Sequence, residues 1–252
     1  MLIYDAEHLN RLLLSVAGLD RPGHFSALIP QRGREYTGEL MVVGRCTNGR
    51  GSPDQEAREG TWFTLVTLAD PTTRSALIAR ILAEATQEAA PARDPLSWVV
   101  GLRSQFWGVA RRIACGLGLS ESRWYRHVAW SNLYKVAPAA GGTVTETHTA
   151  PQMEVCQALL RHELVTLRPR RDTFMLGCGS EANWFQWFEG PLGFVEQGHQ
   201  RLLGRHPIRW GAIGDASVIV LPHPQGKPLD VLAEAAVGRF GIALKQAPGV
   251  PE

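Results

Sequence analysis

Long apolar runs are missing from this sequence: no window reaches the roughly 20 uninterrupted apolar residues of a membrane-spanning helix. The stretch Met1–Asp20 carries Asp5, Glu7 and Arg11, so it lacks the apolar core of a secretion signal. Internal repeats are also absent, and no stretch rich in Pro, Gly or Ser divides the chain. We therefore expect a cytoplasmic protein that makes no contact with a membrane and forms one domain over residues 1–252.

Cysteine is scarce and scattered. The four cysteines form neither a CxxC pair nor a Cys/His ligand pattern; they are Cys46, Cys115, Cys156 and Cys178. This distribution argues against a structural zinc site and a disulfide scaffold, and we predict no metal and no other cofactor. A strong excess of charge is missing too. The net charge is only +2, so binding to nucleic acid would require a local basic surface.

What the chain does contain is a broad alternation of helical and strand-like segments. Apolar residues recur at helical spacing in the stretches 7–16, 73–89, 103–117, 151–167 and 229–240. Short apolar runs typical of strands occupy 39–45, 61–68, 128–136, 173–176 and 217–221. This alternation predicts a three-layer α/β/α fold with a central four-stranded, mainly parallel sheet.

Four of the predicted strands run directly into polar loops rich in glycine or proline. Each strand together with its loop occupies 40–49, 128–138, 173–179 or 218–226. Because the carboxyl ends of parallel strands meet at one edge of a sheet, we expect the loops to converge there. The last of them holds His223 between Pro222 and Pro224. A surface turn that happens to contain a histidine is the simpler alternative for this loop.

The motifs at these strand ends, taken in order, resemble those of the uracil-DNA glycosylase superfamily. They are Val42–Gly49, Ser131–Pro138, Glu163–Pro169 followed by Thr173–Gly179, and Leu221–Gly226. The last is similar to the superfamily's His-Pro loop, which carries a catalytic histidine and a minor-groove wedge. The second is similar to the Thr-Asn-x-x-Lys-Cys-x-Pro stretch of the iron–sulfur members. Val136 stands where those members have a cysteine, so we predict no cluster.

The resemblance spans residues 38–226, with an insertion around 49–102, and it implies a role for individual residues. His223 would be the catalytic residue that stabilises the departing base, as a fixed donor placed where negative charge develops. Asn132 would read the flipped base with its amide, and local capping of a loop is the alternative for this residue. Further substrate contacts would come from Gly44, Arg45 and Cys46, and nucleic-acid contacts from Lys135, Pro224, Gln225 and Lys227. A solvated strand end is the alternative for Lys135.

The first motif departs from the superfamily pattern. Cys46 stands where an Asp or Asn is expected, and Thr47 replaces the proline. A thiol orients or deprotonates water far less well than a carboxylate does. We therefore predict Asn48 as the catalytic residue that positions the water, with Glu146 and His148 as displaced substitutes. A base could stack on an aromatic side chain, or these side chains could simply be core: Trp62, Phe63, Phe106 and Trp107.

The leading hypothesis is a DNA base-excision N-glycosylase that removes uracil or another deaminated base. We expect it to act as a monomer on single- or double-stranded DNA. The alternative from another class is a catalytically altered protein that uses the same fold for nucleic-acid binding or another interaction. A hydrolase of small nucleosides or nucleotides is a third possibility, which would need a closed pocket and no basic groove.

Overall fold

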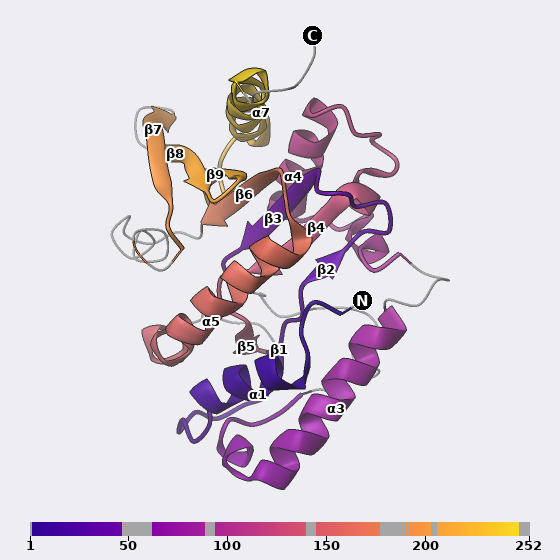
Figure 1. The fold of residues 1–252 in the computed structure, drawn as a ribbon, viewed down its shortest axis with the longest axis vertical. Helices are drawn as coiled ribbons and strands as arrows, with labels where there is room; N and C mark the ends of the chain where they lie inside the picture. The colour runs from indigo at the N-terminus through magenta and orange to yellow at the C-terminus, as the bar shows by residue number, and fades with distance from the viewer. Residues whose placement is uncertain are drawn as a thin grey trace. The chain divides into compact units, whose positions relative to one another are not determined.

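A computed structural model describes residues 2–46, 62–88, 94–139, 145–176, 190, 192–202 and 206–246 (Figure 1). The chain divides into two compact units, each assembled from three separate pieces. Unit 1 comprises Met1–Pro30, Arg45–Arg93 and Ser131–Thr166. Unit 2 comprises Gln31–Gly44, Asp94–Trp130 and Leu167–Glu252. The expectation of one domain with an insertion around 49–102 stays a prediction, and part of that insertion lies outside the described residues.

Unit 2 is built on a seven-stranded sheet in the order β2-β4-β3-β6-β9-β8-β7 (Figure 1). Its strands are β2 (Gln31–Arg32), β3 (Leu40–Gly44), β4 (Val128–Asn132), β6 (Arg171–Leu176), β7 (Val195–Leu202), β8 (His206–Ile213) and β9 (Ala216–Pro222). The last two residues of β4 already belong to unit 1. Every residue of β3 is buried, as its uninterrupted apolar sequence requires.

The predicted fold class is wrong in both the size and the pairing of the sheet. The described parallel pairings are β3 with β6 and β6 with β9. The pairings of β2 with β4, β8 with β9 and β7 with β8 are antiparallel, and they outnumber the parallel ones. Within this sheet, the strands that the sequence analysis missed are the two-residue β2 and the β7–β8 hairpin. Neither carries the apolar run by which buried strands are recognised.

The helical elements of unit 2 are η3 (Ser97–Val99), α4 (Gln105–Gly116), η4 (Trp124–His127) and α7 (Leu229–Gln246). The α4 helix begins after Ser104, whose side chain accepts a hydrogen bond from the Trp107 amide. Helices α4 and α7 pack closely because glycines of α4 face side chains of α7. A Cβ on Gly116 would lie 2.6 Å from Val237, and one on Gly108 would lie 3.1 Å from Leu229.

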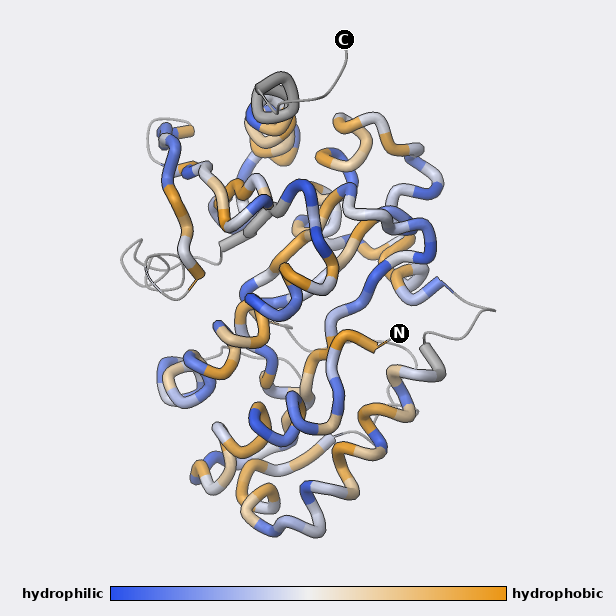
Figure 2. Tube along the Cα trace, viewed as in Figure 1, coloured by the Kyte–Doolittle hydropathy of each residue, from blue (hydrophilic) through white to orange (hydrophobic). Residues whose placement is uncertain are grey.

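Unit 1 contains α1 (Ala6–Ser15), η2 (Val66–Ala69), α3 (Pro71–Glu88), α5 (Glu146–Leu167) and the antiparallel pair β1 (Phe25–Ala27) and β5 (Val136–Pro138). Apolar and polar residues alternate along α3, as its predicted helical periodicity requires (Figure 2). The predicted strand over 61–68 is wrong: Phe63 forms a single bridge to Phe25, and a 3-10 helix follows. None of the described helices combines the length and apolarity needed to cross a membrane.

Candidate functional site

The His223 loop, residues 223–227, follows β9 directly and is held by its own backbone. The Gln225 amide donates to His223 Nδ1 at 3.2 Å, and the Lys227 amide donates to the Pro224 carbonyl at 3.0 Å. Gly226 adopts a positive φ of 70°, which an L side chain rarely tolerates. Because Nδ1 accepts a hydrogen bond from an amide, the neutral ring carries its proton on Nε2. The loop thus fixes both the position and the tautomer of the histidine.

The amino end of α4 anchors the same loop from a second side. The Gln105 side-chain oxygen accepts a hydrogen bond from the Gly226 amide at 3.1 Å. Gln105 is the first residue of α4, so the helix start and the His223 loop are joined directly. Further along, Arg112 of α4 forms an ion pair with Asp230 at the start of α7. Gln225 is exposed, His223 and Lys227 are half-buried, and the ring of Pro224 is buried.

The parallel part of the sheet places Gly44 at the same edge as His223. Val43 of β3 pairs with Phe174 of β6, and Phe174 pairs with Val220 of β9. Gly44 ends β3 and His223 follows β9, so they lie at the carboxyl ends of two parallel strands with only β6 between them. Neighbouring strands lie about 4.8 Å apart, so the ends of β3 and β9 are separated by about 10 Å across the sheet. The buried Gly44 offers its backbone to this edge, and it has no side chain that could act on a substrate.

Two other predicted motifs come together in unit 1. The Tyr134 amide, just beyond β4, donates to the Arg45 carbonyl at 2.9 Å. Asn132, the last residue of β4, is buried. Burial raises the pKa of the Cys46 thiol, although Arg45 acts in the opposite direction. A thiol with a raised pKa is a poor nucleophile and a poor base at neutral pH, so Cys46 does not replace the missing carboxylate.

The Lys135 ammonium is enclosed by the protein, in contrast to its predicted contact with nucleic acid. Its Nζ lies 2.7 Å from Glu163 Oε1 and 2.6 Å from Ser131 Oγ. It also donates to the Asn132 carbonyl, and both side chains of the ion pair are fully buried. Tyr4 donates its hydroxyl to the same Glu163 oxygen. This arrangement holds the end of β4 and does not suit a phosphate contact at the surface.

Gln152, like Glu163, is a buried polar residue to which the sequence analysis assigned no role. Its side-chain oxygen accepts hydrogen bonds from the Lys135 and Val136 amides at 3.1 and 2.9 Å. Its side-chain nitrogen donates to the Val136 carbonyl at 3.0 Å and to the His148 carbonyl at 2.9 Å. Gln152 therefore satisfies backbone groups of Lys135 and Val136 at the start of β5. A polar residue on the apolar side of a predicted helix was the available signal for both Gln152 and Glu163.

The remaining candidate residues, for base stacking and for water activation, lie in different surroundings. Phe63 and Trp107 are buried core residues, and the Trp107 ring centroid lies 5.5 Å from those of Trp98 and Trp130. Glu146 is exposed in the first turn of α5. His148 is half-buried, with its ring 5.5 Å from Phe25; burial and then Arg21 lower its pKa. Asn48, the predicted water-positioning residue, lies outside the described residues.

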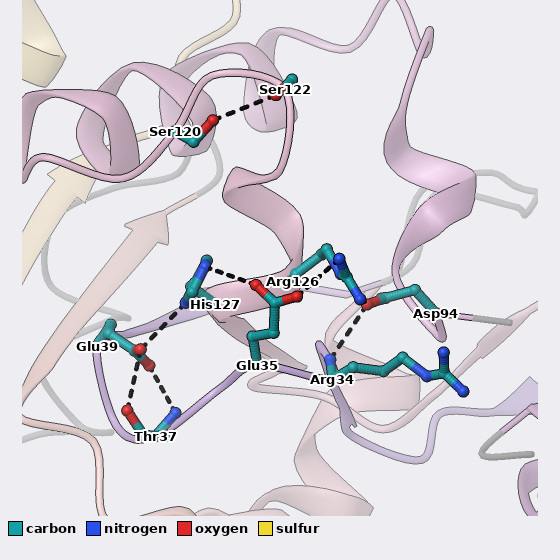
Figure 3. Close-up of polar contacts among 9 residues, drawn as sticks. All are labelled: Arg34, Glu35, Thr37, Glu39, Asp94, Ser120, Ser122, Arg126 and His127. Carbon is teal, nitrogen blue, oxygen red and sulfur yellow. Dashed lines mark hydrogen bonds and ion pairs between the residues drawn. The ribbon is translucent and has the colours of Figure 1, made fainter. Parts of the chain in front are cut away.

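A separate polar cluster joins the segments that enter β3 and β4 (Figure 3). His127 Nε2 lies 3.1 Å from Glu35 Oε2, and His127 Nδ1 lies 3.2 Å from Glu39 Oε1. Glu35 also pairs with Arg126 at 2.7 Å, and Arg126 lies 3.6 Å from Asp94. Carboxylates thus face Arg126 and His127 throughout the cluster, which ties the loop before β3 to the end of η4. Its residues precede the strands, whereas Gly44 ends β3 and His223 follows β9.

Over the parts that the structure describes, no group of three or more His, Cys, Asp or Glu residues is arranged to hold a metal ion. No protein-family model matches the chain, and no curated protein sequence matches it either. The resemblance to the uracil-DNA glycosylase superfamily therefore rests on the quoted motifs alone.

Proposed function

We propose that this chain hydrolyses the N-glycosidic bond of a deaminated base in DNA, with His223 stabilising the departing base. The observation that carries the proposal is the hydrogen bond from the Gln225 amide to His223 Nδ1. It keeps the neutral ring as a donor through Nε2, and neighbouring backbone contacts hold that ring at a sheet edge. A donor that is already oriented stabilises developing charge without reorganising during the reaction.

The chemistry requires that the C1′–N bond breaks and that its electron pair leaves with the base. A donor at a carbonyl of the base lowers the energy of the resulting anion, and this is the role of His223. A water oxygen forms the new bond to C1′ and releases a proton to solvent or to a nearby base. Asn132 remains the predicted reader of the base, and Asn48 the predicted residue that positions the water.

The test uses oligonucleotides that carry uracil, hypoxanthine or xanthine, followed by alkali to break the strand at abasic sites. We expect the wild-type chain to cleave at one of these bases. His223→Ala should slow cleavage by about 10²–10³-fold, the usual effect of removing one preorganised donor. His223→Gln, which keeps a side-chain donor, should retain more activity than His223→Ala.

A matched control is His199→Ala, because His199 is an exposed histidine of the same unit, on β7. It should cleave as the wild type does. If His223→Ala cleaves at the wild-type rate, the role of His223 is wrong. If the wild type cleaves none of the substrates, the glycosylase proposal itself fails.

One observation favours a second candidate, a binding protein without this activity. Cys46 stands where the resemblance predicts an Asp or Asn, and burial raises the pKa of its thiol. A chain that lacks a base for the water could still bind DNA. Salt-sensitive binding to the same oligonucleotides, together with an absence of cleavage, would support this candidate.

A further inference from the structure

Strand β7 forms one edge of the seven-stranded sheet (Figure 1). It is eight residues long, and its inner side pairs with β8. Among the residues that the structure describes, no strand pairs with its outer side. The strand contains neither proline nor lysine, the residues that commonly keep an edge from pairing. Its outer backbone groups can therefore bind a further strand.

Contacts with β8 and α7 hold β7 in place. Gly198 faces the ring of Trp210 on β8, and a Cβ added to Gly198 would lie 2.6 Å from that ring. The Arg239 guanidinium of α7 lies 3.9 Å from the centre of the same ring, and it donates to the Gln200 side-chain oxygen at 2.9 Å. A strand that is already held loses little conformational entropy when another strand pairs with it.

Pairing with β8 sets the order of positions along β7. His199 lies opposite Arg209, and three paired residues of β7 stand on each side of His199. Gln197 is not one of them, because the register shifts between Glu196 and Gly198, where a bulge adds one residue. His199 is therefore the central paired position of the strand.

The sequence of β7 is complementary to itself about this central position. When two β7 strands pair antiparallel with His199 opposite its equivalent, each residue meets the one equally far on the other side of His199. Glu196 then lies opposite Arg201 of the second copy, and Val195 lies opposite Leu202 of the second copy. An acid faces a base and an apolar side chain faces another, once at each end of the pair.

The charged side chains also lie on the same face of the sheet. Glu196 Oε1 lies 2.9 Å from His199 Nδ1, and Glu196 Oε2 lies 3.0 Å from Arg209. Arg201 shares this face with His199, because alternate residues of a strand point to the same side. Residues that lie opposite each other in an antiparallel pair must share a face, and Glu196 and Arg201 meet this condition. Shifting the register by two residues in either direction separates Val195 from Leu202.

Exposure and charge indicate that the outer edge of β7 is incomplete in one copy. Val195 is 65% exposed, and Leu202 is half-buried, so pairing would cover apolar surface at both ends. Arg201 is exposed, and among the described residues no carboxylate lies within ion-pair distance of it. Glu196 of a second copy would supply that carboxylate.

From these contacts we propose that two copies of this chain pair through β7 about a two-fold axis at His199, so that their sheets join into one. The sequence analysis predicted a monomer, and the proposal replaces that expectation. It does not rest on the proposed function, because no residue of the His223 loop takes part. Two paired edge strands bury less surface than a permanent dimer does, so we expect association at micromolar concentrations.

Analytical ultracentrifugation over a range of concentrations tests the charge pairs. The wild type should show a monomer–dimer equilibrium. Arg201→Glu and Glu196→Arg each place like charges opposite each other at both ends, and each variant alone should dimerise at least about tenfold more weakly. An equimolar mixture of the two variants restores both acid–base pairs and should form a mixed dimer about as tight as that of the wild type.

Cross-linking tests the register without changing these charges. His199→Cys places two thiols at the two-fold axis, where opposite Cα atoms lie about 5 Å apart, within reach of a disulfide. The matched control is Val195→Cys, which is also exposed on β7. Its two copies would lie six paired positions apart, about 20 Å, too far for a disulfide. With oxidised glutathione, covalent dimers should form in His199→Cys well above the background of the wild type, and not in Val195→Cys.

A wild type that stays monomeric at every concentration would overturn the proposal. So would a dimer that Arg201→Glu leaves as tight as before, or covalent dimers that form equally fast in His199→Cys and Val195→Cys. Thermal denaturation shows whether each variant keeps its fold. If Glu196→Arg does not fold, Arg201→Glu and the cross-linking pair decide the question.

Discussion

Lys135 Nζ lies 2.7 Å from Glu163 Oε1, and neither side chain is exposed to solvent. The pair joins the end of β4 to the α5 helix within unit 1. Two buried, opposite charges are stable only as a pair, because no water reaches the remaining charge to solvate it when its partner is removed. Each of the two residues therefore fixes the position of the other.

The first prediction concerns this pair. Glu163→Gln leaves the ammonium of Lys135 buried without a carboxylate, and it should lower the free energy of unfolding by about 3–5 kcal/mol. Lys135→Met in the same chain should restore part of that loss, because both buried charges are then gone. Urea denaturation of the two single variants and the double variant measures the coupling. A control is Arg111→Gln, which breaks an exposed ion pair with Glu121 and should cost at most about 1 kcal/mol.

The second prediction concerns alkaline pH. Burial raises the pKa of Cys156 from 9.0 to about 12, although Lys135 nearby acts in the opposite direction. In the unfolded chain the thiol ionises near 9.0, so the folded state holds the proton more tightly. The contribution of this thiol to folding stability is fully present below pH 9 and is lost as the pH rises toward 12.

Urea denaturation at pH 8 and 10.5 checks this effect, with Cys156→Ala as the comparison. The difference in stability between the two pH values should be smaller in Cys156→Ala than in the wild type. If the stability change between the two pH values is the same in both proteins, another group causes the loss at alkaline pH. Tyr4 is then the first candidate, since burial and Glu163 raise its pKa well above 10.0.

The third prediction concerns acid pH and the cluster in Figure 3. Partial burial acts to raise the pKa of Glu39, but hydrogen bonds from Thr37 and His127 outweigh it and leave the pKa lowered. A lowered pKa means that its contribution to stability is present above pH 4.5, the ordinary value, and is lost as the pH falls through the folded pKa. Glu39→Gln should therefore lose less stability between pH 6 and pH 3 than the wild type. Thermal denaturation across this range measures it, and a steeper loss in the variant would contradict the assignment.

The fourth prediction concerns the anchor of the His223 loop. Gln105→Met removes the acceptor of the Gly226 amide and should lower kcat for base excision by about tenfold, through a misplaced His223. Gln105→Glu keeps an acceptor oxygen and should retain most of the activity. Both variants should bind the substrate with similar affinity, because Gln105 acts on the loop. If the two variants have the same kcat, the hydrogen bond does not position the histidine.

Apolar pattern predicts those elements of the fold that bury their side chains. The five amphipathic stretches are helices, and the runs of β3, β4, β6 and β9 are strands. The β7–β8 hairpin was missed because its first strand, Val195–Leu202, is mostly polar and lies at the edge of the sheet. An edge strand needs no apolar face. It forms because it pairs with the neighbouring strand, so its own sequence gives little indication that it is a strand.

The candidate site also has a part that the sequence could predict and a part that it could not. The place of His223 after a buried strand could be predicted, because a parallel sheet fixes where its strand ends lie. The burial of Lys135 could not, because it depends on Glu163 and Tyr4, which are distant in sequence. A lysine after a strand has the same local pattern whether its ammonium meets solvent or a buried carboxylate.

The interleaving of the two units has a consequence for synthesis of the chain. By Thr166 the ribosome has made every residue assigned to unit 1. Strand β3 of unit 2 is made early, but its parallel partner begins only at Arg171. The growing chain therefore carries a wholly apolar strand with one side unpaired while the intervening helices are translated. During translation this unpaired strand is the segment that most needs protection from aggregation, more than any part of the folded protein's surface.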